Sequence, residues 1–162
     1  MNINELLKLA SFAGQMILEN GGETYRAEDT MVRMLANKVD DVETFVTPTG
    51  IFMSVEQGGA IYTKVSRITK RDTDLNKIAH VNDFSRRFSK EEWKTLDIVK
   101  YTEELKYINS MGKYNDLLRI FASGLAAAAS MMMLGGSSND FIPTFITAML
   151  LQVSVMFFRR IG

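Results

Sequence analysis

The sequence predicts an α+β protein in two parts. Residues 1–112 form a helical α/β domain with a small antiparallel β-hairpin sheet, and residues 113–162 form a two-helix transmembrane hairpin. Three observations predict this organisation. Residues 120–136 and 141–158 contain no charged side chain, whereas 16 of the 19 cations and 18 of the 19 acids lie within residues 1–116. Between residues 42 and 69, β-forming runs are separated by turn residues, and the segments on either side have helical periodicity.

Helical periodicity predicts a first helix over residues 3–20 and a second over residues 24–38, separated by the helix stop Asn20-Gly21-Gly22. The first helix is expected to pack in a core. The alternative, a position on the membrane surface, is less favoured because its polar face lacks the lysine and arginine typical of interfacial helices. The side chains expected to face the core from the second helix are Ala27, Met31, Met34 and Leu35.

Residues 43–47, 51–55 and 60–69 are predicted strands, because they are rich in β-branched and aromatic residues. Pro48 marks a strand edge or turn, since proline cannot donate a ladder hydrogen bond. Gln57-Gly58-Gly59 is typical of a hairpin turn.

Two further helices are expected after the sheet, from residue 73 to about residue 88 and from residue 90 to about residue 110. Ser89 and Glu92 have the spacing of a capping box for the second of these helices. Trp93 and Leu96 would then lie on its apolar face.

The two charge-free runs are long enough to cross a bilayer. Each spans about 26 Å as a helix, at a rise of about 1.5 Å per residue, against a hydrocarbon thickness of about 30 Å. We expect transmembrane helices at about residues 116–136 and 141–160. The alternative is a helical hairpin buried in the core of a soluble protein.

The cations around these runs predict the orientation of the hairpin. Lys113 and Arg119 precede the first run, Arg159 and Arg160 follow the second, and the turn between them has no lysine or arginine. The positive-inside rule then places both outer ends in the cytoplasm. A surface of small residues that includes Gly124 and Ala128 favours close helix packing.

Composition and motifs argue against several other function classes. The formal net charge is zero, so no bulk field favours nucleic acid as a partner. The chain has no cysteine and a single histidine, His80, and it lacks a Gly-x-Ser-x-Gly elbow and a glycine-rich phosphate loop. We therefore expect no enzyme activity, no catalytic residue, no metal site and no cofactor.

Four sets of residues form a recognisable series along the chain. They are Gly-Gly-Glu-Thr-Tyr-Arg-Ala-Glu at residues 21–28, Phe-Val-Thr-Pro-Thr-Gly-Ile at residues 45–51, Arg67-Ile68 with Arg71 and residues 74–78 and 81–82, and Gly135-Gly136 with Asp140. These segments resemble the threonine/serine exporter family, which includes bacterial exporters of small amino and dicarboxylic acids. They occur in the family's order and cover nearly the whole chain.

The resemblance implies a cytoplasmic amino-terminal domain, a multi-helix membrane region in the cell (inner) membrane, and export of small amino or carboxylic acids. Family members continue for several more membrane helices, in the same chain or in a separate membrane subunit. We therefore expect this chain to be truncated after two membrane helices. Its expected partners are the lipid bilayer and further transmembrane helices. These helices would come from a missing carboxy-terminal part or from a second membrane subunit. A homo-oligomer is a further possible assembly.

Export of small acids requires cationic or N–H donors, and amino acids also require an acceptor. Arginine suits carboxylates because its planar fork is bidentate, and ionisable residues in a membrane region are rare enough to indicate function. The alternatives are ion pairs within the domain, a helix cap at Asp140 and helix packing at Gln152. The candidate substrate or transport residues are Glu23, Thr24, Arg26, Glu28, Arg67, Arg71, Asp140 and Gln152.

Two functions are consistent with these residues. The favoured one is the amino-terminal part of a secondary exporter of threonine, serine or related small amino or carboxylic acids. The alternative is a membrane-tethered ligand-binding or regulatory module, in which the first domain binds a ligand and the hairpin serves as an anchor.

Overall fold

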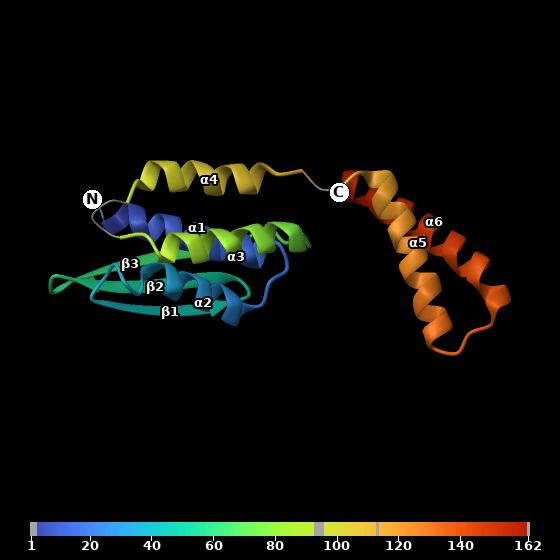
Figure 1. Ribbon diagram of the computed structural model, residues 1–162, viewed down its shortest axis with the longest axis horizontal. Coiled ribbons are helices and arrows are strands. Elements are labelled where there is room, and N and C mark those ends of the chain that lie inside the picture. Colours follow the sequence, from blue (N-terminus) through green and yellow to red (C-terminus); the bar gives the residue numbers. More distant parts are fainter. Residues whose placement is uncertain (1–2, 93–95, 113, 162) are drawn as a thin grey trace. The chain divides into compact units, whose positions relative to one another are not determined.

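The computed structural model describes residues 3–92, 96–112 and 114–161, with side chains as far as residue 158. The chain divides into two compact units, Met1–Met111 and Gly112–Gly162 (Figure 1). The first unit contains four of the described helices and a three-stranded sheet, and the second contains a helical hairpin. The predicted α+β class is confirmed.

The sheet of the first unit is antiparallel, in the order β1-β2-β3. The strands are β1 (Asp41–Thr47), β2 (Gly50–Gln57) and β3 (Ala60–Arg67). Phe45 pairs with Phe52, which pairs with Val65. The face formed by Ile51, Met53 and Val55 of β2 is buried, whereas the opposite face is exposed.

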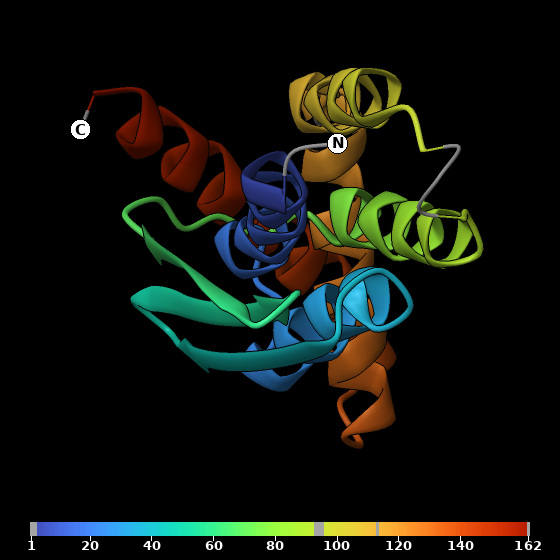
Figure 2. The same ribbon diagram turned by 90° about the vertical axis from the view of Figure 1, so that its left-hand side faces the viewer.

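The helix α1 (Ile3–Glu19) is the centre of this unit. It contacts α2 (Thr24–Leu35), α3 (Leu75–Ser89), α4 (Ile98–Ser110) and the two strands β2 and β3 (Figures 1 and 2). Its buried side chains occupy most of its circumference, which explains why it packs as a core helix. They are Ile3, Leu6, Leu7, Leu9, Ala10, Ser11, Ala13, Met16, Ile17 and Leu18.

The helices α3 and α4 are joined by aromatic packing. The ring of Tyr101 in α4 meets Phe84 and Phe88 of α3 edge-on, with centroid distances of 5.8 and 5.1 Å. Arg87 adds an ion pair to Glu104 across the same two helices and another to Asp83 within α3. These two hydrogen-bonded carboxylates raise the pKa of Arg87, which keeps the guanidinium charged.

Most predicted elements of the first unit are confirmed. The first two helices and the three strands lie where the sequence predicts them, with ends that shift by one to three residues. The helix α3 begins at Leu75, two residues after its expected start. The four side chains expected to face the core from α2 are fully buried.

The predicted start of the next helix and its capping box are wrong. Ser89 is the last residue of α3, and its hydroxyl donates to the carbonyl of Arg86. The helix α4 begins only at Ile98, where the carboxylate of Asp97 accepts the N–H of Lys100 at 3.1 Å. Leu96 is buried but precedes the helix, and Trp93 lies outside the described residues. Asp97 therefore supplies the cap that the sequence assigned to Ser89.

The second unit is a hairpin of α5 (Asp116–Met133) and α6 (Phe141–Ile161), joined through a short 3-10 helix, η2 (Ser138–Asp140). Asn115 caps α5 by accepting the N–H of Leu117 at 3.0 Å. Gly135 has a φ of 87°, a left-handed conformation that suits glycine at a helix end.

Small residues allow α5 and α6 to approach closely, as the sequence predicts. Gly124 and Ala128 are buried in the hairpin, and a Cβ on Gly124 would lie 2.8 Å from Met149 and 2.9 Å from Phe145. The rings of Phe121 and Phe145 are 5.5 Å apart.

Both helices of the hairpin are long and apolar enough to cross a membrane. Only 11% of the apolar window of α5 and none of that of α6 is buried. Ala122 and Phe157 are among the exposed residues. Within their own unit the two helices are therefore largely uncovered, and their length and composition fit the predicted membrane spans.

Candidate functional site

Three segments that are distant in sequence meet at one end of the first unit. Asp74 donates its N–H to the carbonyl of Asn20 at 3.0 Å, which places the start of α3 beside the end of α1. Ile68 donates to the carbonyl of Thr49 at 2.9 Å, which places the end of β3 beside the β1–β2 turn. We call residues 20–28, 45–51 and 67–74 together the motif junction.

Glu28 connects two segments of the junction. Its carboxylate accepts the N–H of Val46 on the edge strand β1 at 2.8 Å. A hydrogen bond to a charged group contributes about 1.5–3 kcal/mol, and this one also satisfies a strand N–H that the sheet leaves unpaired. Glu28 therefore holds α2 against the sheet.

Glu23 and Arg26 lie at the start of α2 and remain open to solvent. They form an exposed ion pair with an N···O distance of 3.3 Å. Exposed pairs of this kind stabilise a protein by about 0–1 kcal/mol, so both groups can exchange partners at little cost. Thr24, the first residue of α2, is half-buried between them.

Two arginines belong to the third segment of the junction, residues 67–74. Arg71 donates to the carbonyl of Pro48 at 2.6 Å, which fixes it beside the β1–β2 turn. Arg67 is the last residue of β3, opposite Gly50 at the same end of the sheet. Its guanidinium is exposed and has no hydrogen-bond partner among the described residues. The junction thus offers guanidinium groups that a carboxylate can reach.

Asp140 and Gln152, the two candidates in the hairpin, lie at different depths. Asp140 is the exposed last residue of η2, and no backbone N–H of the described residues bonds to its carboxylate. The side-chain cap of this turn is instead Ser137, which accepts the N–H of Asn139.

Gln152 is half-buried and continues the face of α6 that carries Phe145 and Met149, the side chains nearest Gly124. Its amide makes no hydrogen bond within the described part of the hairpin. In a membrane such an amide requires a partner, which a neighbouring helix supplies.

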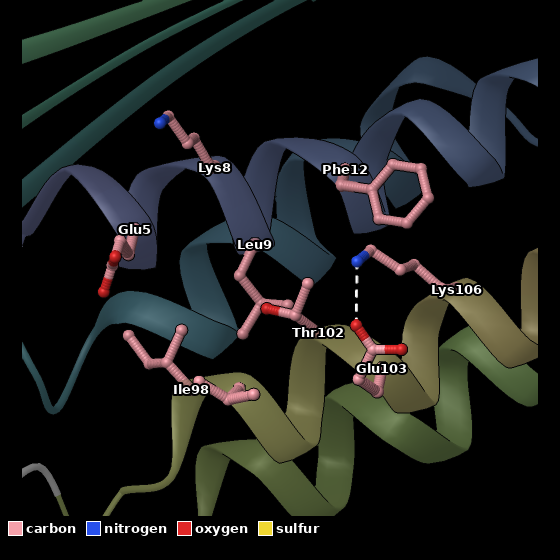
Figure 3. Close-up of a pocket in the computed structure, with 9 residues that line it drawn as sticks. Glu5, Lys8, Leu9, Phe12, Ile98, Thr102, Glu103 and Lys106 are labelled. Atoms are coloured by element: carbon pink, nitrogen blue, oxygen red, sulfur yellow. Dashed lines mark hydrogen bonds and ion pairs between the residues drawn. The ribbon is translucent and has the colours of Figure 1, made fainter.

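A hollow of about 530 Å³ lies between α1 and α4 (Figure 3). Leu9, Phe12 and Ile98 form an apolar floor, and Lys106 is paired with Glu103 at the rim at 2.8 Å. Its size is within the range of small-molecule pockets. The remaining residues around it are Glu5, Lys8, Val99 and Thr102.

Neither this hollow nor the exposed apolar face of the sheet could be predicted from the sequence. The hollow depends on which sides of α1 and α4 meet, and periodicity does not give that pairing. The alternation of β3 was visible, but its apolar residues Ile61 and Val65 face outward and Lys64 faces inward. No cluster of three or more metal-ligating side chains occurs among the described residues.

The two units together define a class: a membrane protein with an α+β unit joined to a membrane-length helical hairpin. A family model described as "Putative threonine/serine exporter" (ThrE) matches residues 8–162. The chain therefore belongs to the threonine/serine exporter family, a family of membrane transporters, and the resemblance found in the sequence is confirmed. No curated protein and no solved structure matches the chain.

Proposed function

We propose that this chain is the cytoplasmic unit and first two membrane helices of a secondary exporter of threonine, serine or related small amino or carboxylic acids. The observation that carries the proposal is the family match, which extends across both units. We place the protein in the cell (inner) membrane, with the first unit in the cytoplasm, where it meets solutes before export.

The motif junction supplies the chemistry that such cargo requires. Arg26, Arg67 and Arg71 are proposed to bind the carboxylate, because their guanidinium groups are accessible and bidentate. Glu23 is proposed as the acceptor for the ammonium group of an amino acid. Glu28 is proposed to act mainly by holding β1 in place, through its bond to Val46.

The hairpin is proposed to form part of the transport path with other helices. Asp140 would meet cargo or protons at the outer end, and Gln152 would bond a helix that packs against α6. The role of Gln152 is supported by its amide, which has no partner among the described residues and lies on a half-buried face of α6. Leaving such a group unbonded in lipid would cost free energy. Those helices belong to a second membrane subunit or to a further part of the protein.

A flux measurement tests this proposal. Proteoliposomes are made with the full chain and the membrane proteins that co-purify with it, and are loaded with labelled threonine, serine or a dicarboxylate. We expect efflux above that of protein-free vesicles. Arg71→Gln should reduce it by roughly tenfold to a hundredfold, the effect of losing one charge-assisted hydrogen bond. Arg86→Gln, an exposed change on α3 outside the junction, should leave it unchanged. Efflux equal to that of protein-free vesicles with all three solutes would refute the exporter.

The hollow between α1 and α4 favours a second candidate function, a membrane-tethered binding or regulatory module. It combines an apolar floor with charged groups at its rim, away from the motif junction. Calorimetry on the full chain in detergent distinguishes the two. Micromolar binding of a nucleotide or a protein partner, unaffected by threonine, serine and dicarboxylates, would favour the module. Binding of the exported acids that Arg71→Gln abolishes would favour the exporter.

A further inference from the structure

The outer face of the sheet carries an apolar row that no other element of the first unit covers. Phe45, Phe52 and Val65 lie side by side on the three strands and are 64%, 47% and 58% exposed. The two phenyl rings are 6.2 Å apart. An antiparallel sheet normally turns polar residues to solvent, so an aromatic row flanked by polar residues indicates an interaction surface.

The two ends of this face have opposite charge. Counting outward from the apolar row, Glu43 and then Asp41 and Glu56 lie on one side, as the strand register requires. On the other side Arg67 lies opposite Gly50, and Arg71 is held beside the β1–β2 turn by its bond to the carbonyl of Pro48. Along the strand direction, the charged residues of the face are therefore acidic on one side of the apolar row and basic on the other.

We propose that this face binds the same face of a second copy of the chain. A two-fold rotation about an axis parallel to the apolar row turns one sheet over and reverses its strand direction. The acidic end of each copy then lies on the basic end of the other, and the two apolar rows meet at the axis. Such a self-complementary patch is what a two-fold interface requires, and sheets pack face to face at about 10 Å.

Two other occupants fit the charges less well. An anionic membrane surface would be repelled by the three carboxylates, which outnumber Arg67 on the face and Arg71 beside the β1–β2 turn. A small anionic solute would have to use the shallow hollow of about 440 Å³ on this face, which is lined by Glu43, Phe45, Phe52, Ser54 and Thr63 and contains no cation. A second copy satisfies both charged ends at once.

The lack of cysteine in the sequence permits a direct test. The full chain carrying Ser54→Cys, one step from the apolar row, is treated in membranes with a bis-maleimide that reaches about 16 Å. We expect a cross-linked dimer, whereas the control Arg86→Cys on the exposed side of α3 should give at least tenfold less. Equal yields from the two positions would overturn the proposal. It would also be overturned if Ser54→Cys were unreactive towards a monofunctional maleimide and gave no dimer, because another occupant would then cover the face.

Charge reversal in the Ser54→Cys background tests the orientation. Glu43→Lys or Arg67→Glu alone should reduce the dimer at least fivefold, because the reversed charge then repels the facing end of the other copy. Combining the two reversals in one chain should restore it, and that recovery separates loss of association from misfolding. Single reversals without effect, or a double variant as weak as the single ones, would overturn the two-fold arrangement. The result is independent of transport, because dimer yield is measured without flux.

Discussion

Among single residues, Glu28 shows how a family motif position supports the fold. Its carboxylate accepts a strand N–H at 2.8 Å, so its removal leaves a half-buried donor without a partner. We expect Glu28→Ala to lower the free energy of unfolding by about 1–3 kcal/mol. Glu28→Gln keeps an acceptor oxygen and should cost less than half of that. Chemical denaturation of the full chain in detergent measures both.

Glu23→Ala is the matched control for Glu28, because it removes a carboxylate of the same helix that only forms an exposed ion pair. We expect a loss of less than about 1 kcal/mol. If Glu28→Ala were as mild as Glu23→Ala, the bond to Val46 would not hold α2 on the sheet, and the position would have to act through cargo.

Lys38 is a buried cation in the first unit, with 4% of its surface exposed. Its ammonium group lies 4.9 Å from the centre of the Phe88 ring and 3.4 Å from the carbonyl of Ser89. Burial lowers the pKa of Lys38 below its ordinary value of 10.5, and the nearby Glu91 offsets this only in part. The folded protein therefore binds fewer protons than the unfolded chain between the lowered pKa and 10.5.

This linkage predicts a pH dependence with a definite sign. Between the lowered pKa and pH 10.5, the wild type should become more stable relative to Lys38→Met as the pH rises, because the cost of the buried charge disappears. Thermal unfolding of both proteins between pH 8 and 10.5 measures this difference. Tyr101 is present in both proteins, so its contribution to the pH dependence of stability cancels in the comparison. A difference that is flat or decreases with pH would contradict the burial of a charged Lys38.

At the scale of elements, the contact between α5 and α6 depends on the lack of a side chain at Gly124. A larger residue there would collide with Met149 and Phe145, because a Cβ at this position would lie only 2.8–2.9 Å from their side chains. We expect Gly124→Val to separate the helices and to lower the midpoint of thermal unfolding of the hairpin in detergent. Ala126→Val, on the exposed side of α5, should leave that midpoint unchanged. Equal midpoints in the two variants would show that the small-residue face does not set the packing.

The sequence predicted elements well where periodicity and breakers agree. Gly21 and Gly22 end the first helix, and Gly58 and Gly59 form the β2–β3 turn. The sequence-based prediction was wrong at the start of α4. Ser89 and Asp97 can both cap a helix, and tertiary packing determines which of them does so.

The candidate site was predictable in part. The motif segments identified Glu28 and Arg71, but not their partners Val46 and Pro48, because those bonds depend on how α2 and the end of β3 lie against the sheet. The apolar outer row was hidden for a related reason. Alternation shows that a strand has two faces, but it does not show which face the helices cover when both carry apolar residues.

At the scale of the whole molecule, the chain divides into two compact units and the family match includes both. The sequence places cations at the outer ends of the hairpin and none in its turn. The central claim is therefore that α5 and α6 cross the membrane as a hairpin, with the first unit in the cytoplasm.

Labelling of single cysteines with a membrane-impermeant maleimide tests this claim most directly. Ser138→Cys, in the turn, and Ser110→Cys, at the end of α4, are produced in intact cells as full chains. We predict that the turn is labelled from outside and that Ser110→Cys is labelled only after the membrane is permeabilised. Labelling of Ser110→Cys in intact cells, or labelling of Ser138→Cys only after permeabilisation, would contradict the account.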